Sequence, residues 1–91
     1  PLGTINYISR FFTFIMKERD LHHCINLKLD RYFKHLNGES TTGVFKMVTQ
    51  QAESATLNYV LDQVNQNHSE AARILGINRA TLKKKIALYQ L

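Results

Sequence analysis

Residues 67–86 have the sequence NHSEAARILGINRATLKKKI, and this pattern predicts two short helices joined by a tight corner. Ala71 and Ala72 are small, as two helices that cross at short range require. Gly76 stands at the corner, where a positive φ costs little only for glycine. Asn78 is a suitable cap for the second helix. The segment therefore has the features of a helix-turn-helix, with one helix over residues 69–75 and the next over 79–89.

Apolar side chains would hold this helix pair together. Leu75 and Ile77 flank the corner, while Leu82, Ile86 and Tyr89 recur at helical spacing along the second helix. We expect these five side chains to form the inner face of the motif.

The outer face of the second helix carries the chemistry of a DNA reader. Arg79 lies in the first turn, where a major-groove helix places its base contacts, and its guanidinium can donate twice to guanine O6 and N7. Thr81 can touch a base edge or a phosphate. Lys83, Lys84 and Lys85 span most of a turn, so they cannot all face one groove, and at least one is expected to reach a flanking phosphate. Asn67 and Ser69 lie at the start of the preceding helix, whose N–H groups suit a phosphate.

The charge distribution favours the same partner. The chain of 91 residues has a formal net charge of +5. Residues 68–91 hold five basic side chains and one acidic one, so +4 of this charge lies in that C-terminal stretch. Such a concentration indicates a polyanion, with nucleic acid as the first candidate and an anionic membrane surface as the second. A plain helical hairpin with a solvated lysine face is the alternative that the corner alone would allow.

Two longer helices are predicted upstream. Asp20 can cap a helix over residues 20–37, in which Leu21, Ile25 and Leu29 recur at helical steps and Asn37-Gly38 forms the stop. A second, long helix is predicted over residues 44–66. It has more apolar surface than one short neighbour can cover, which favours pairing with a second copy of the chain. Phe33 and Phe45 are expected in the core.

Catalytic and metal chemistry find little support in the sequence. His22, His23 and Cys24 are adjacent, so they point in different directions on a helix and make a poor metal site. Cys24 beside Ile25 is expected to lie near the core. With one cysteine there can be no internal disulfide. We therefore predict no enzyme activity, no metal site and no cofactor.

Residues 1–19 are expected to be an arm outside the helical domain. Pro1-Leu2-Gly3 resembles the remnant of a cleaved expression tag, and residues 4–16 are apolar and predicted to be a strand or a disordered arm. Met16 is a candidate natural start. No apolar run is long enough for a transmembrane helix, so no membrane partner is expected.

Residues 67–85 resemble the DNA-binding end of Fis, the factor for inversion stimulation, a family of bacterial nucleoid-associated proteins. The core of this resemblance is Gly-Ile-Asn-Arg-x-Thr-Leu-x-Lys-Lys, which begins at Gly76. Tyr32-Phe33, Leu36-Asn37-Gly38 and the long helix that follows match in order and spacing, so the resemblance covers about residues 20–91.

The resemblance implies an all-α, four-helix subunit in an intertwined homodimer. Residues 20–66 would be the dimerisation helices, and residues 67–91 the helix-turn-helix region. The family's two recognition helices lie closer together than one DNA turn, so bound DNA bends and is preferably AT-rich. The DNA contacts of the family carry over onto Asn67, Ser69, Asn78, Arg79, Thr81, Lys83, Lys84 and Lys85. The implied function is that of a DNA-bending transcription regulator in the cytoplasm, on the nucleoid.

Some positions depart from the family pattern. Glu70, Ala87 and Leu88 stand where relatives often carry basic groups, and Ala55 replaces a proline that kinks the long helix. Residues 4–19 do not resemble the charged arm that contacts invertases, so stimulation of a recombinase is not carried over. Two alternatives stay open: a DNA-binding module of a larger sigma-54-dependent activator, whose C-terminal domains share the same core, and a membrane-surface or protein-interaction module.

Overall fold

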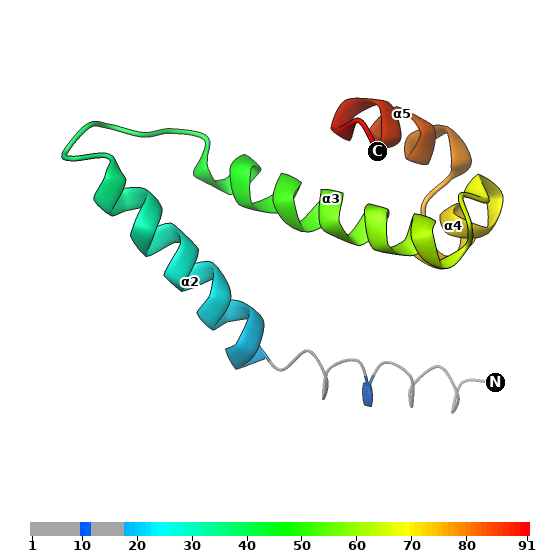
Figure 1. Cartoon of the computed structure of the whole chain (residues 1–91), viewed down its shortest axis with the longest axis horizontal. Helices are drawn as coiled ribbons and strands as arrows, with labels where there is room; N and C mark the ends of the chain where they lie inside the picture. The colour runs from blue at the N-terminus through cyan, green and yellow to red at the C-terminus, as the bar shows by residue number, and fades with distance from the viewer. Residues whose placement is uncertain (1–9, 12–17) are drawn as a thin grey trace. The chain divides into compact units, whose positions relative to one another are not determined.

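The computed structural model describes residues 10–11 and 18–91; residues 18–91 contain four helices, and neither range contains a strand. They are α2 (Glu18–His35), α3 (Val44–Gln63), α4 (His68–Leu75) and α5 (Arg79–Tyr89) (Figure 1). The chain divides into two units, residues 1–42 and 43–91, which we describe separately. The predicted all-α fold class with a C-terminal helix-turn-helix is confirmed.

The predicted N-terminal arm lies largely outside the described residues, as does Met16. Of the predicted strand or disordered arm over residues 4–16, Arg10 and Phe11 are described, and their backbone is helical rather than extended.

The first unit contains α2. Asp20 lies inside this helix, which already includes Glu18, so its predicted role as N-cap is wrong. The helix ends at His35, two residues before the predicted end, because Asn37 and Gly38 adopt left-handed backbone conformations with φ of 53° and 86°. In the loop that follows, Thr41 Oγ1 lies 2.7 Å from Tyr32 Oη, and this hydrogen bond ties the loop to the helix.

The second unit is built on α3, which is shorter than the predicted helix over residues 44–66. It stops at Gln63 because Asn65 and Gln66 take positive φ values of 51° and 66°. The N–H of Gln66 donates to the carbonyl of Leu61 over 2.9 Å, which closes the last turn. This reversal directs the chain into α4.

The corner between α4 and α5 has the predicted chemistry. Gly76 has a φ of +75° and ends α4. The N–H of Ile77 donates to the carbonyl of Ala72 over 3.2 Å and the N–H of Gly76 to the carbonyl of Arg73 over 3.3 Å, in the pattern of a Schellman motif. Ile77 then packs against the core, as the residue after the left-handed position usually does in this motif.

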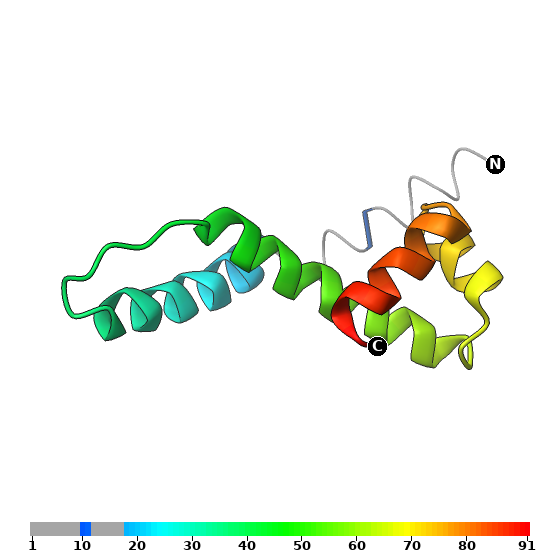
Figure 2. The same cartoon turned by 90° about the horizontal axis from the view of Figure 1, so that it is seen from above.

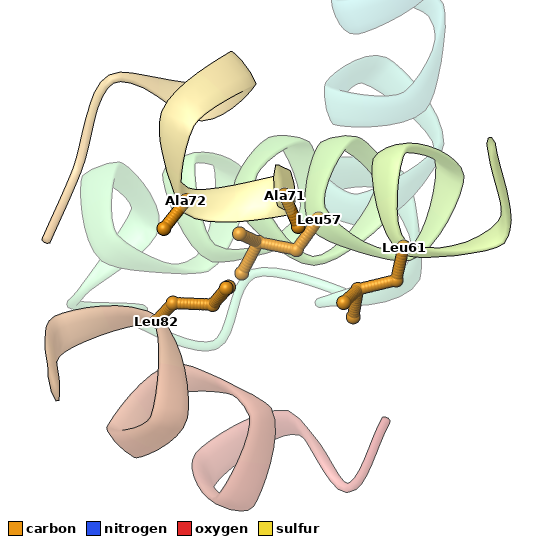
Figure 3. Packing of buried hydrophobic residues seen from close by; sticks show 5 residues of the cluster. All are labelled: Leu57, Leu61, Ala71, Ala72 and Leu82. Atoms are coloured by element: carbon orange, nitrogen blue, oxygen red, sulfur yellow. The ribbon is translucent and has the colours of Figure 1, made fainter. Parts of the chain in front are cut away.

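The core of the second unit joins all three of its helices. Leu57 and Leu61 from α3, Ala71 and Ala72 from α4, and Leu82 from α5 converge at one point (Figure 3). Leu82 and Ala71 are fully buried, and each buried leucine contributes about 1.5–3 kcal/mol of hydrophobic stabilisation. The predicted inner-face residues Leu75, Ile77, Ile86 and Tyr89 pack around this cluster. Beyond the corner, α5 turns back so that its C-terminal end lies beside α3 (Figures 1 and 2).

Three expectations about the core are wrong within the single chain. Phe33 is 52% exposed, Phe45 is 78% exposed, and Cys24 is exposed as well. Helical spacing identifies a face that is apolar, but it does not say whether that face is covered by the same chain.

We expect Gly76→Ala to lower the free energy of unfolding by about 1 kcal/mol, because a side chain at a positive φ is strained. No atom lies within 4 Å of the position that the new Cβ would take, so the loss is a backbone effect. Urea denaturation measures it. Gly76→Asn is the matched control and should lose less, since asparagine tolerates the left-handed region. An equal loss in both variants would argue against backbone strain as the cause.

Candidate nucleic-acid interface

The outward face of α5 is fixed by its buried side. Successive residues of an α-helix are about 100° apart, so a helix that buries Leu82 directs Lys83 and Lys84 toward solvent. Arg79, Lys83 and Lys84 are all exposed, and Arg79 and Lys83 lie on one side of the helix at i and i+4. Thr81 is half-buried. All three cations are therefore exposed, with Arg79 and Lys83 about 40° apart and Lys84 about 140° from Arg79 around the helix axis.

Asn78 caps the N-terminus of this helix. Its side-chain Oδ1 accepts a hydrogen bond of 2.7 Å from the N–H of Thr81, which makes it the N-cap as predicted. The first intrahelical bond runs from the N–H of Leu82 to the carbonyl of Asn78, so the N–H groups of Arg79 and Ala80 precede it. With Oδ1 engaged, the side chain of Asn78 offers its Nδ2 donors to a ligand. The site therefore suits an acceptor such as a phosphate oxygen or guanine N7.

The start of α4 is organised in the same way. Asn67, rather than Ser69, caps the helix: its Oδ1 accepts from the N–H of Glu70 over 3.1 Å. The helix begins at His68, so Ser69 lies inside its first turn. Both predicted residues are thus placed at a helix N-terminus, where the first-turn N–H groups have no partner within the helix and suit an anion.

Glu70 and Arg73 neutralise each other on α4. Arg73 Nε donates to Glu70 Oε2 over 3.1 Å, and Arg73 Nη2 donates to Glu70 Oε1. The hydrogen bonds from Arg73 lower the pKa of the Glu70 carboxyl, and Glu70 raises the pKa of Arg73 in turn. Because these two charges are paired within the helix, they add no net charge to the surface, and the positive potential comes from α5.

Lys85 points the other way from Lys83. Its Nζ donates to Glu53 Oε1 on α3, and the hydroxyl of Tyr89 donates to the same oxygen over 3.0 Å. About a third of each side chain in the ion pair remains exposed, 32% for Lys85 and 36% for Glu53. The hydrogen bonds from Lys85 and Tyr89 lower the pKa of Glu53, and the bond to Glu53 raises the pKa of Lys85. Desolvation raises the pKa of Tyr89, and the hydrogen bond to Glu53 adds to this effect.

Helical periodicity indicates that three consecutive lysines cannot share one face, but it does not identify which one turns inward. Glu53 is missed by the sequence analysis because it lies 32 residues from Lys85, and Tyr89 is expected there only as an apolar contact. The one sign of Glu53 in the sequence is an acidic residue among mostly apolar and polar neighbours on the long helix, and such a residue is equally compatible with a solvated surface position.

Comparison with known proteins agrees with the geometry. Residues 50–89 match the family model described as bacterial regulatory protein, Fis family. Over 67 residues, 74% of this chain, it is 45% identical to a putative Fis-like DNA-binding protein of Neisseria meningitidis and covers 85% of that protein. The chain belongs to the Fis family.

Other Fis relatives are more distant but cover a similar length. A putative Fis-like DNA-binding protein of Ralstonia nicotianae is 41% identical over 71 residues, which are 78% of this chain and 92% of that protein. The DNA-binding protein Fis of Proteus mirabilis is 32% identical over 72 residues, 79% of this chain and 74% of that protein. The matched length exceeds the helix-turn-helix in each case, so the likeness to Fis includes helices that precede the motif.

Other kinds of site are not found in the described part of the chain. No group of three or more His, Cys, Asp or Glu side chains among residues 10–11 and 18–91 is placed to hold a metal ion. Across the same ranges, no helix combines the length and apolar character needed to cross a bilayer.

The ion pair of Glu53 predicts an acid-sensitive contribution to stability. The pKa of Glu53 is lowered from its ordinary value of 4.5, so the contribution is complete above pH 4.5 and is lost as the pH falls through the lower, folded-state value. We expect the free energy of unfolding, measured by urea at a series of pH values, to fall less steeply below that ordinary value in Glu53→Gln than in the wild type.

Glu39→Gln, at an exposed position in the loop before α3, is the matched control for loss of a carboxylate. In this variant the free energy of unfolding should fall at low pH as steeply as in the wild type. If it fell equally steeply in Glu53→Gln, the ionisation of Glu53 would contribute nothing to stability.

Proposed function

We propose that the protein is a homodimeric, DNA-bending nucleoid-associated protein that regulates transcription with weak sequence preference. The observation that carries this proposal is the orientation of α5. Burial of Leu82 and capping by Asn78 leave Arg79, Lys83 and Lys84 exposed to solvent. The names of the Fis relatives support DNA as the partner, and the working location would be the nucleoid in the cytoplasm.

The chemistry of the exposed residues fits the two kinds of DNA contact. Arg79, at the first position of α5, would read base edges in the major groove, because its guanidinium can donate twice to guanine. The remaining contacts would bind the phosphate backbone and set the register. These are Asn67 and Ser69 at the start of α4, and Asn78, Thr81, Lys83 and Lys84 on α5.

The exposed side of α3 supports the homodimer. Phe45 and Tyr59 are 14 positions apart, nearly four full turns, so they lie along one side of the helix, and they are 78% and 66% exposed. Leu57 and Leu61 each lie about 200° around the helix from Tyr59, on the side that α4 and α5 cover. A helix that is apolar on both sides needs a second partner, and a second copy of the chain would bury this side symmetrically.

Dimerisation places two copies of α5 on one duplex. If the copies lie closer together than one helical turn of DNA, as the likeness to Fis implies, the duplex has to bend to engage both. The energy of bending depends on the sequence being bent, which would produce preference for AT-rich DNA without base contacts at every position.

The decisive experiment is a gel-shift titration with a 25-base-pair AT-rich duplex, followed by bend analysis on circularly permuted fragments. We expect a complex of two chains per duplex and a bend centred on the site. With Lys83 and Lys84 as the cationic phosphate contacts of each subunit, log K should fall against log salt with a slope of about −4 for the dimer. No retarded complex at low salt would refute DNA binding, whereas co-sedimentation with anionic liposomes that DNA does not compete away would favour a membrane-surface role.

Arg79→Ala should cost about 1–3 kcal/mol of binding free energy on preferred sites and flatten the preference among sites. The measurement is binding to a randomised duplex library, with bound and free fractions sequenced. Full retention of discrimination in this variant would exclude Arg79 as a base reader.

Lys84→Ala is the matched comparison on the same helix. A lost phosphate contact should weaken binding to all sequences alike and reduce the magnitude of the salt slope by about 1 per bound subunit. If the salt slope stayed at the wild-type value, Lys84 would not contact the backbone.

A further inference from the structure

We propose that Glu53 is a positioning residue for DNA recognition: by holding Lys85 and Tyr89 against α3, it fixes the rotation of α5 about its own axis. This inference rests on the DNA binding proposed above and adds a residue from the long helix to the recognition machinery. It also gives Lys85 a role other than direct contact with DNA.

Few side chains of α5 are buried deeply enough to fix its orientation. It has 11 residues, and Leu82 is the one that is fully buried. Ile86 and Tyr89 also pack against the core, but they are only partly buried, so these apolar contacts leave α5 some freedom to rotate about Leu82. A second attachment, displaced along the helix, removes this freedom.

Glu53 supplies the second attachment. Lys85 and Tyr89 are separated by four positions, so they lie one above the other on the same side of α5, and Leu82 precedes them on that side. Both donate to one carboxylate oxygen, Oε1 of Glu53. The attachment is thus one to two turns beyond Leu82, and the two points together define both the position and the rotation of the helix.

The rotation decides which lysines face outward. Around the helix axis, Lys84 is separated from Lys85 by about 100° and Lys83 by about 200°. When Leu82 and Lys85 both face α3, Lys83 and Lys84 are directed away from α3 on the two flanks of the opposite side. A rotated helix would instead expose Lys85 and move Arg79 and Lys83 from the outward face.

The surroundings of the pair favour a stable contact. A groove of about 380 Å³ borders it, and the other residues that line this groove are mainly apolar: Ala52, Thr56, Leu57, Leu75 and Ile77. About two thirds of each charged side chain is covered, so the attraction between the charges is screened less than between two fully exposed groups.

Loss of Glu53 should change two properties of DNA binding, sequence discrimination and salt dependence, in a combination that simple destabilisation does not produce. Glu53→Gln keeps the shape of the side chain but removes its charge, which weakens the hold on Lys85 and leaves this lysine as a cation that is no longer neutralised. Discrimination among sequences should fall, because α5 is no longer held in one rotation. The magnitude of the salt slope should rise at the same time, by about 0.9 per bound subunit, because one more cation contacts phosphate.

The test uses the full chain in the randomised 25-base-pair library and in salt titrations of a single AT-rich duplex. We expect Glu53→Gln to lose about tenfold in the ratio between the best-bound sequences and the median, comparable with the loss of one bidentate base contact. Asp62→Asn is the matched control, since it removes an exposed negative charge from the same helix. It should leave discrimination unchanged.

Tyr89→Phe is a second variant in case Glu53→Gln does not fold, as judged by circular dichroism. It removes one donor to Glu53 and leaves the Lys85 pair intact, so discrimination should fall while the salt slope stays constant. Unchanged discrimination in a folded Glu53→Gln variant would overturn the positioning role while leaving the proposed DNA binding intact. A uniform loss of affinity without a steeper slope would reduce Glu53 to a stabilising residue, and absence of DNA binding by the wild type would overturn both proposals.

Discussion

Burial of Leu82 is the contact on which the arrangement of residues 43–91 depends. Its side chain belongs to one buried cluster with Leu57 and Leu61 of α3 and with Ala71 and Ala72 of α4, and it is the fully buried residue that α5 adds to this core. The alanines are part of the same constraint, because larger side chains there would keep α4 too far from α3 for Leu82 to reach both. Since a helix has a fixed angle between successive residues, the burial of Leu82 also determines where Arg79, Lys83 and Lys84 point.

The two asparagine caps have a consequence beyond stability. Asn67 and Asn78 each use Oδ1 to satisfy a backbone N–H at the start of a helix. Each keeps both Nδ2–H donors for an external partner, and each lies beside first-turn backbone N–H groups that have no partner within the helix. Both helix starts consequently present mainly hydrogen-bond donors. A surface of this kind complements phosphate oxygens and disfavours cations, even before the charges on α5 are considered.

Local chemistry explains which parts of this structure are predictable. The corner at Gly76, the cap at Asn78 and the helix over residues 79–89 agree with the sequence-based expectation, because each depends on residues within one or two turns. The errors have two physical sources. The predicted ends of α2 and α3 lie too late, since Asn37, Asn65 and Gln66 adopt left-handed conformations that periodicity does not reveal. Phe33 and Phe45 are exposed rather than in the core, because an apolar face does not specify what covers it.

The charges of the candidate site also separate into those that local sequence predicts and those that depend on packing. The sequence-based charge count assigns Lys83, Lys84 and Lys85 equal weight, and it counts Arg73 with them. In the structure, Arg73 is neutralised by Glu70 one turn away, and Lys85 by Glu53 on another helix. The first pairing follows from helical spacing, but the second depends on how α5 packs on α3. Net charge in residues 68–91 therefore overstates the number of cations available to a polyanion. Arg79, Lys83 and Lys84 are the basic residues of α5 that remain directed to solvent, and their placement, more than the total charge, makes this surface suitable for DNA.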